Sequence, residues 1–167
     1  LGRLVGSEMC IRDSIDKLRA ARTGISFSSD FIVGFPGETD EHFQDTLDLV
    51  EKVGYDESFS FIYSPRPNTT AKDLEDSVPI GIKKERLNLL QQKLEKSALS
   101  ISRRMVGQIR KCLVTGVSKK NPGEFQARAD NNKVVIFACN NESLIGDFVD
   151  IEIVEAKNKS IRGLLVA

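Results

Sequence analysis

Two different periods of apolar residues divide this chain. In residues 40–53 and again in residues 79–105, apolar positions recur every three or four residues, which predicts two amphipathic helices. Pro79 is well placed to start the second helix, because proline is favoured in a first helical turn. After Gly107 the period changes to the alternation that is typical of β-strands. The pattern therefore predicts an α/β part followed by an all-β part.

Two predicted strands flank the first helix. Residues 25–35, ISFSSDFIVGF, alternate and then become continuously apolar, which predicts a strand buried on both faces of a parallel sheet. Residues 58–64, SFSFIYS, predict the next strand, and residues 14–24, SIDKLRAARTG, predict the end of a preceding helix. A strand, a helix and a strand in this order predict a parallel pair with a right-handed crossover.

Short strands separated by turn residues fill the last third of the chain. The strand patterns are followed or interrupted by turn signals at residues 121–123, 130–132 and 157–159. This arrangement predicts a small antiparallel barrel of the OB-fold kind. The helix 79–105 then links two domains, which we expect at residues 15–103 and 104–167.

The first fourteen residues, LGRLVGSEMCIRDS, have no clear period and do not lead well into the helical pattern of residues 14–24. The string resembles translated sequencing-adapter sequence, so we expect residues 1–14 to be non-native and exclude them from the fold prediction. A genomic copy that continues upstream in frame would disprove this expectation.

The charge of the chain changes sign along its length. Residues 1–76 hold eight basic and fifteen acidic residues, a net charge of −7, whereas residues 77–167 carry +7 and the whole chain carries none. Such a split predicts two modules, the second with a polyanionic partner. Solvated surface charge explains the split equally well.

Composition narrows the class of protein. The 40% hydrophobic and 29% charged residues are ordinary for a globular protein. No apolar run approaches the roughly 20 residues of a membrane helix, and no signal-peptide pattern opens the chain, so we expect a cytoplasmic location and no membrane association. Cys10, Cys112 and Cys139 lack the short spacing of metal or redox motifs, which predicts plain thiols in a reducing compartment.

The segment VGFPGE, residues 33–38, is the strongest candidate ligand site. Gly34 and Gly37 allow backbone shapes and a close approach that side chains forbid, and Pro36 stiffens the turn between them. The turn lies between a predicted parallel strand and a helix N-terminus, at the sheet edge where α/β proteins bind ligands. On the glycine pattern alone, a tight turn without any ligand is favoured.

Other polar residues near the strand ends are weaker candidates. At the end of the second strand, Tyr63, Ser64 and Arg66 should project from an extended, proline-containing loop. Arg66 is either an anion contact or a surface arginine of an acidic module. Asp30 could orient a cofactor hydroxyl, but a structural role is favoured. His42, the only histidine, falls in the first turn of an acidic helix, which favours a solvated position over general-base catalysis.

Basic residues gather in the second half. Residues 101–120 contain six lysines and arginines and no acid. Phe125 and Phe137 could supply stacking rings, although core positions are favoured for both. A basic face on a small barrel predicts RNA binding driven by phosphate neutralisation. The candidate RNA contacts are Arg66, Arg110, Lys111, Lys119, Lys120, Arg128 and Lys133.

Residues 28–79 resemble the radical-S-adenosylmethionine tRNA methylthiotransferases, on the motifs IVGFPGET and SFSFIYSPRP. The second motif favours the branch that methylthiolates N6-dimethylallyladenosine beside the anticodon. The sister branches, which act on threonylcarbamoyl-adenosine or on a ribosomal protein, share the first motif. The basic barrel resembles the family's TRAM domain, an RNA-binding module. The resemblance extends from about residue 15 to the end of the sequence.

The resemblance implies that residues 15–103 are the last βα units of a partial (βα) barrel that holds S-adenosylmethionine and a [4Fe-4S] cluster. The family's CxxxCxxC cluster motif is absent here, so we assign no metal ligand and no catalytic residue, and expect this chain alone to be inactive. Asn68 replaces a glycine that is usual in the family, which leaves the detail of the second turn open. Matched to the family motifs, the cofactor contacts fall on Ile32, Gly34, Gly37, Tyr63 and Ser64.

The sequence thus predicts the C-terminal part of a monomeric tRNA-modifying transferase whose partner is the anticodon stem-loop. The alternative is a non-catalytic RNA-binding TRAM protein with an α/β appendage. An upstream reading frame that contains CxxxCxxC would favour the enzyme, and a genuine start codon near residue 1 would favour the alternative.

Overall fold

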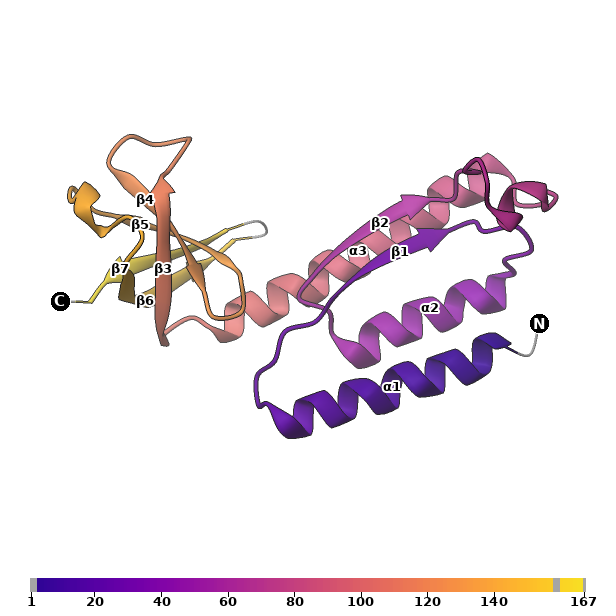
Figure 1. Cartoon of the computed structure of the whole chain (residues 1–167), viewed down its shortest axis with the longest axis horizontal. Coiled ribbons are helices and arrows are strands. Elements are labelled where there is room, and N and C mark those ends of the chain that lie inside the picture. Colours follow the sequence, from indigo (N-terminus) through magenta and orange to yellow (C-terminus); the bar gives the residue numbers. More distant parts are fainter. Residues whose placement is uncertain (1–2, 158–159, 167) are drawn as a thin grey trace. The chain divides into compact units, whose positions relative to one another are not determined.

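The computed structural model describes residues 3–157 and 160–166. The chain divides into two compact units, residues 1–98 and residues 99–167, and each is described by itself (Figure 1). The division falls within one helix, so it interrupts no loop.

The first unit is built around a parallel pair of strands. Its elements are α1 (Arg3–Ala21), β1 (Ser28–Val33), α2 (Asp40–Val53), β2 (Glu57–Ile62), the 3-10 turn η1 (Thr70–Asp73) and most of α3 (Ile80–Arg104). β1 and β2 pair in parallel, with Ser28 beside Glu57 and Val33 beside Ile62. The predicted strand–helix–strand unit is confirmed.

Local capping determines where α2 begins and ends. Thr39 accepts a hydrogen bond from the His42 amide at 3.2 Å, and His42 Nδ1 accepts one from the Thr39 amide at 3.4 Å. Gly54 ends the helix in the left-handed region at φ 61°, and its amide donates to the Val50 carbonyl. These caps satisfy backbone groups that a helix terminus otherwise leaves unpaired. The predicted bounds of α2 are confirmed.

One face of the β1–β2 sheet is buried and the other is exposed. Phe31 and Val33 of β1 lie in a core cluster with residues of α1, α2 and α3, such as Val50 and Leu90. Ile32, on the opposite face of β1, is 57% exposed. The prediction that this strand is buried on both faces is therefore wrong for this chain. The helices of this unit contribute to a single cluster on one side of the sheet, so the apolar run FIV is covered on that side alone.

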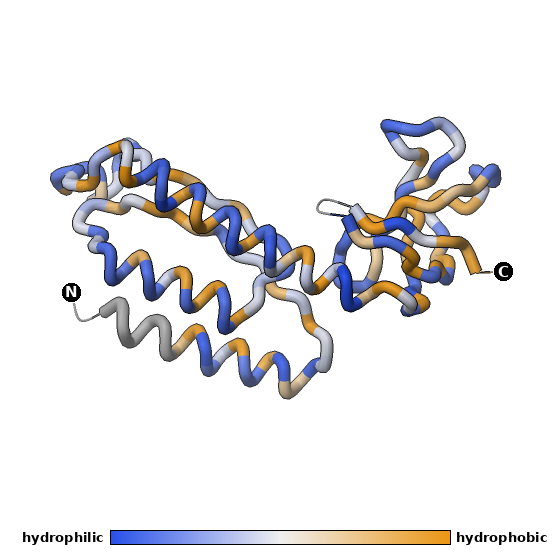
Figure 2. The backbone as a smooth tube through the Cα atoms, turned by 180° about the vertical axis from the view of Figure 1, so that it is seen from behind, coloured by the Kyte–Doolittle hydropathy of each residue, from blue (hydrophilic) through white to orange (hydrophobic). Residues whose placement is uncertain are grey.

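The first helix extends further towards the N-terminus than the apolar pattern predicts. α1 begins at Arg3, although the sequence predicts only a helix end in residues 14–24. Only the encoding DNA can test whether residues 1–14 are native, so their non-native origin stays a prediction. α3 agrees with the predicted helix within one residue at each end, and Figure 2 shows apolar residues recurring along it between polar ones. No helix in the described part of the chain is long and apolar enough to cross a membrane.

The second unit is a closed five-stranded barrel. Its strands are β3 (Ile109–Val117), β4 (Glu124–Ala129), β5 (Val134–Ala138), β6 (Phe148–Ala156) and β7 (Ile161–Leu165), with the 3-10 turn η2 (Glu142–Leu144) between β5 and β6. They close in the order β3-β4-β5-β7-β6. Four pairings are antiparallel, but β5 and β7 pair in parallel, so the prediction of a wholly antiparallel barrel is wrong in this one pairing.

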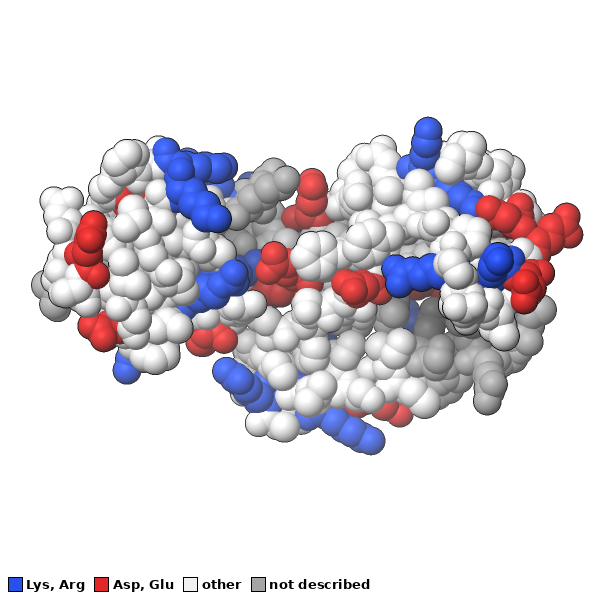
Figure 3. Space-filling model, turned by 45° about the horizontal axis from the view of Figure 1, so that its top comes forward, with Lys and Arg blue, Asp and Glu red and all other residues white. Residues whose placement is uncertain are grey.

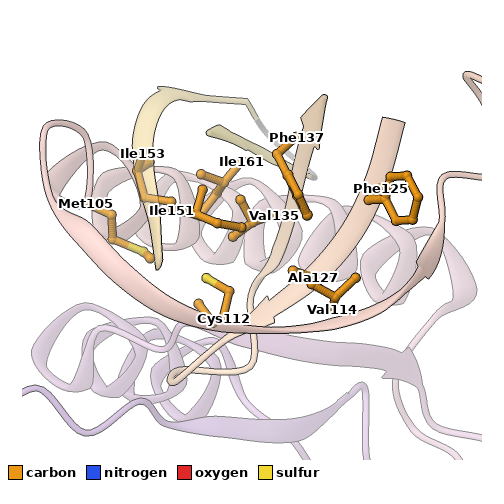
Figure 4. Packing of buried hydrophobic residues seen from close by; sticks show 11 residues of the cluster. Met105, Cys112, Val114, Phe125, Ala127, Val135, Phe137, Ile151, Ile153 and Ile161 are labelled. Atoms are coloured by element: carbon orange, nitrogen blue, oxygen red, sulfur yellow. The ribbon is translucent and has the colours of Figure 1, made fainter. Parts of the chain in front are cut away.

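The barrel interior is filled by alternate residues of all five strands. Phe125 and Phe137 are almost fully buried, with ring centroids 6.1 Å apart, so the core position favoured for both rings is confirmed. Met105, just after α3, also points into this core (Figure 4). The remaining labelled side chains are Cys112, Val114, Ala127, Val135, Ile151, Ile153 and Ile161.

Cys112 should resist alkylation while the barrel is folded. Burial raises the pKa of its thiol from 9.0 to about 11, so almost no thiolate forms at neutral pH. We expect iodoacetamide to modify the exposed Cys10 and to spare Cys112, as read by mass spectrometry of the native chain, whereas both react in urea. Because the raised pKa favours the neutral thiol in the folded state, the free energy of unfolding should also fall as the pH rises from about 9 to about 11. Equal labelling of Cys10 and Cys112 in the native chain would contradict this prediction.

Candidate functional site

The carboxyl ends of β1 and β2 lie side by side, as the parallel pairing requires. The Tyr63 amide, just after β2, donates to the Val33 carbonyl at 2.9 Å. The rings of Phe35 and Tyr63 meet edge to face with centroids 5.0 Å apart. The structure therefore brings together the two strand ends that the sequence predicts to form one site.

The turn after β1 is closed by side chains of its own neighbourhood. The Gly34 amide donates to a carboxylate oxygen of Glu38, and the Gly37 amide donates to Ser77 Oγ at 3.1 Å. Both glycines have positive φ angles, 70° for Gly34 and 81° for Gly37, which other residues rarely adopt. Both amides thus already have hydrogen-bond acceptors. A ligand at this turn would therefore make van der Waals contact with the backbone rather than hydrogen bonds to these N–H groups.

The two glycines are required for different reasons. A Cβ atom on Gly34 would lie 2.4 Å from Cγ of Lys83 in α3, whereas a Cβ atom on Gly37 would meet nothing within 4 Å. Gly34 therefore makes room for a helix side chain, and Gly37 leaves open space. The sequence motif alone cannot distinguish these two roles.

The exposed face of the sheet is mostly apolar near the carboxyl ends of the strands. Ile32 of β1 and Phe61 of β2 are neighbours in the parallel register, and Phe59 lies beside Asp30 two residues earlier. Phe59 is 62% exposed and Phe61 is 52% exposed, which is unusual for phenylalanine. This face, Asp30, Ile32, Phe59 and Phe61, continues to the strand ends. We call it the open sheet face.

The loop after β2 is held partly by Tyr63. Its hydroxyl donates to the Ala71 carbonyl at 2.7 Å, while Ser64 and Arg66 are exposed. Asn68 adopts a φ of 62°, in the left-handed region that glycine and asparagine tolerate best. The asparagine at this position therefore preserves the backbone shape that a glycine would allow.

Two buried cations of α3 lie against these strand ends, and the sequence patterns do not reveal them. Lys83 forms an ion pair with Asp76 at 2.6 Å and lies over the Tyr63 ring. Arg86 binds Glu38 at 3.1 Å and Asp40 at 2.6 Å. Their spacing of three residues on one helix face was the available signal, but charge on a helix usually marks a solvated surface. His42 serves the α2 cap, and Asp30 lies exposed on the open sheet face.

The predicted basic residues of the barrel form two groups, at opposite ends of the β3–β4 pair. Figure 3 shows basic and acidic side chains on the same face of the barrel. Lys119 and Lys120 are exposed in the loop between these strands, whereas the other group lies at the opposite strand ends. In that second group, Arg110 pairs with Asp130 at 3.2 Å and Arg128 binds Asn132. Also in it are Lys111, which is exposed beside Asp150 across the β3–β6 pairing, and the half-buried Lys133.

The loop that carries Lys119 and Lys120 is anchored at its base. Asn121 donates to Glu124 at 2.8 Å, and Arg162 of β7 binds the same carboxylate at 2.7 Å. Hydrogen bonds from Asn121 and Arg162 lower the pKa of Glu124, so it stays ionised over a wide pH range. These contacts hold the base of the loop that carries the two exposed lysines.

One exposed aromatic residue of the barrel was not identified from the sequence. Phe148 is 67% exposed and lies beside Leu113 across the β3–β6 pairing. The alternation of β6, with Ile151 and Ile153 pointing inward, was the signal that could have shown Phe148 pointing outward.

The three cysteines differ in burial and in their place along the chain. Cys10 is exposed on α1, Cys112 is buried in β3 and Cys139 is half-buried after β5. Within residues 3–157 and 160–166, no group of three or more His, Cys, Asp or Glu side chains could hold a metal ion.

Comparisons with known proteins cover both units. Residues 103–166 match the family model of the TRAM domain. The chain is 56% identical over 155 residues to the tRNA-2-methylthio-N(6)-dimethylallyladenosine synthase of Pseudomonas savastanoi pv. phaseolicola, a match that covers 93% of this chain and 35% of that protein. It is 54% identical over 156 residues to the synthase of the same name from Chromohalobacter salexigens, which again covers 93% of this chain and 35% of the relative. The chain therefore spans about a third of the length of these relatives, and it matches their C-terminal part.

Proposed function

Because the chain is homologous to the C-terminal third of the tRNA-2-methylthio-N(6)-dimethylallyladenosine synthases, we propose that it is this part of a tRNA methylthiotransferase. The observation that carries the proposal is the 56% identity, which extends over 93% of the chain and so over both units. Such a match includes the strand ends and the barrel together. The rival interpretation, a non-catalytic RNA-binding TRAM protein with an α/β appendage, explains the barrel but gives no reason for the identity in the first unit.

The first unit would supply one wall of an S-adenosylmethionine pocket in a partial radical-S-adenosylmethionine barrel. The open sheet face supports this proposal, because it presents apolar and aromatic side chains beside the strand ends. Ligand pockets are mostly apolar with a few polar groups, and Asp30, Tyr63 and Ser64 would provide polar groups here. The other proposed contacts are Ile32 on this face and Gly34 and Gly37 in the turn.

The residues present fit the nucleoside part of this cofactor better than they fit an iron–sulfur cluster. An exposed aromatic and aliphatic face can cover an adenine ring, whereas the cysteines lie in α1, in β3 and in the loop after β5, without the close spacing of cluster ligands. With its cluster, S-adenosylmethionine supplies the radical chemistry of such enzymes. The part of this chain's own residues would be to bind and orient the nucleoside and to exclude water from it.

The second unit would bind the tRNA substrate near its anticodon. Its TRAM match, its barrel order and its exposed lysine loop support this proposal. Residues 104–167 hold ten basic and seven acidic residues, so the barrel itself has a net charge of only +3. RNA binding by the barrel would therefore depend on where the basic residues lie on its surface. Lys119 and Lys120 stand out because the second group contains the ion pair between Arg110 and Asp130.

Removing the loop charges should weaken RNA binding and its salt dependence. We expect Lys119→Ala with Lys120→Ala to reduce the affinity of the full chain for an anticodon stem-loop about 10-fold at low salt. The slope of log affinity against log salt should fall by about 1.5, because two phosphate contacts are lost. Fluorescence anisotropy with a labelled stem-loop, repeated over a range of salt concentrations, measures both effects.

The matched control removes two exposed lysines of α3, Lys84 and Lys96. This variant has the same net charge but keeps the barrel loop. An equal loss of affinity in both variants would show that binding reflects net charge alone, and would count against the proposed RNA-binding surface.

A further inference from the structure

We propose that Arg86 of α3 is the positioning residue of the turn at residues 34–38. It holds Glu38 in place, Glu38 closes the turn on the Gly34 amide, and the turn thereby keeps the shape that the cofactor pocket requires. The role of the turn in a pocket rests on the proposed function. The positioning of the turn by Arg86 does not.

Arg86 makes three polar contacts that converge on the start of α2. One guanidinium nitrogen donates to both the main-chain carbonyl and the carboxylate of Glu38, each at 3.1 Å, and the other donates to Asp40 at 2.6 Å. The guanidinium also lies over the Phe43 ring, 5.5 Å from its centroid. A planar, forked cation suits such a set of acceptors, whereas a lysine ammonium carries all of its donors on one nitrogen and lacks the fork.

The ion pair between Arg86 and Glu38 is shielded from water. The side chains of Arg86 and Glu38 are 7% and 11% exposed, while the side chain of Asp40 is 97% exposed. Removing one partner from a buried pair leaves the other charge without compensation, which is costly. Glu38 would therefore turn towards water without Arg86, and the Gly34 amide would lose its acceptor.

Lys83, one turn earlier on α3, supports the same turn by packing. Its side chain fills the space beside Gly34, its ammonium group binds Asp76, and it lies over the ring of Tyr63 at the end of β2. The first turns of α3 thus contact both strand ends, although the sequence assigns this helix only a linking role. Positions held by packing and by paired charges are the ones that preorganise a binding site.

Amide hydrogen exchange in the full 167-residue chain tests the role of Arg86. We expect Arg86→Met to accelerate exchange of the Gly34 amide at least 10-fold by NMR, and to leave the amides in the last two turns of α2 and in the barrel unchanged. Arg86→Lys should give an intermediate rate, because it keeps the charge but loses the forked geometry of the guanidinium. The matched control is Lys93→Met, which removes another α3–α2 ion pair, Lys93–Glu51 at 2.8 Å, away from the turn.

Unchanged exchange at Gly34 in both Arg86 variants would overturn the proposal, and so would an equal acceleration throughout the first unit. If Arg86→Met does not fold, the rates in Arg86→Lys decide the question. S-adenosylmethionine added to the wild-type chain tests the pocket separately, through shifts of the Ile32 and Gly37 signals. No shifts in the wild type would count against the pocket, whereas the exchange rates would still decide the role of Arg86.

Discussion

Replacing Gly163 with alanine is expected to destabilise the barrel by about 3 kcal/mol. The added Cβ would lie 2.2 Å from Cγ2 of Ile151 and 2.8 Å from the main-chain carbonyl oxygen of Glu152. Ile151 is fully buried in the barrel core, and Glu152 belongs to β6, which pairs with β7 on this side. The carbonyl oxygen cannot retreat without moving a strand of a closed barrel, and the Ile151 methyl group can move only within a filled core. We expect a lower midpoint of urea unfolding for the barrel. The NMR signals of the barrel amides report this unfolding.

Gly81→Ala is the matched control for this change. It adds the same methyl group in the first turn of α3, where a Cβ would meet nothing within 4 Å. Alanine is favoured over glycine in a helix, so this variant should be more stable by about 0.5–1 kcal/mol. A barrel midpoint for Gly163→Ala equal to that of the wild type would contradict the packing argument.

Replacing Gly34 with alanine should destabilise the first unit by about 3 kcal/mol, because two separate penalties combine. The left-handed backbone at φ 70° disfavours any Cβ by about 1–2 kcal/mol. The new atom would also lie 2.4 Å from Cγ and 2.8 Å from Cδ of Lys83. If Lys83 moved aside, its buried ammonium would lose its pairing with Asp76. Urea unfolding followed by the NMR signals of α2 measures the effect.

Gly37→Ala separates the two penalties. Its φ of 81° imposes a similar backbone cost, but its Cβ would meet nothing within 4 Å. We therefore expect a loss of only about 1 kcal/mol for this variant. Equal losses at the two positions would show that Lys83 adjusts freely, and that Gly34 is required for its backbone angle alone.

Local patterns predicted most of the elements correctly because they depend on near neighbours. The bounds of α2 follow from Thr39 and Gly54 at its ends, and the barrel strands follow from alternation broken by asparagine and glycine turns. The prediction that the two strand ends lie together is confirmed, since parallel strands must bring the segments around Gly34 and Tyr63 to one edge of the sheet. Whether these residues bind S-adenosylmethionine stays a prediction.

The sequence failed where a residue's role depends on a partner far along the chain. Arg86 lies 48 positions from Glu38, and no period or motif connects them. The sequence predicted that the lysines and arginines of the barrel form one basic face. In the folded barrel, Lys119 and Arg110 lie at opposite ends of β3. The one-sided burial of β1 was missed because an apolar run shows only that a strand is hydrophobic, whereas its burial depends on which elements cover each face.

By itself, the sequence determined the helices, the strands, the parallel pair and the small barrel, because hydrophobic period, caps and turn residues act over a few positions. Only the tertiary structure decided that α3 holds the strand-end turn through Lys83 and Arg86, that Gly34 and Gly37 are glycine for different reasons, and that Gly163 admits no side chain. Each of these facts depends on the space that an element far along the chain leaves, or on the charges that it buries. Both are determined only when the chain has folded.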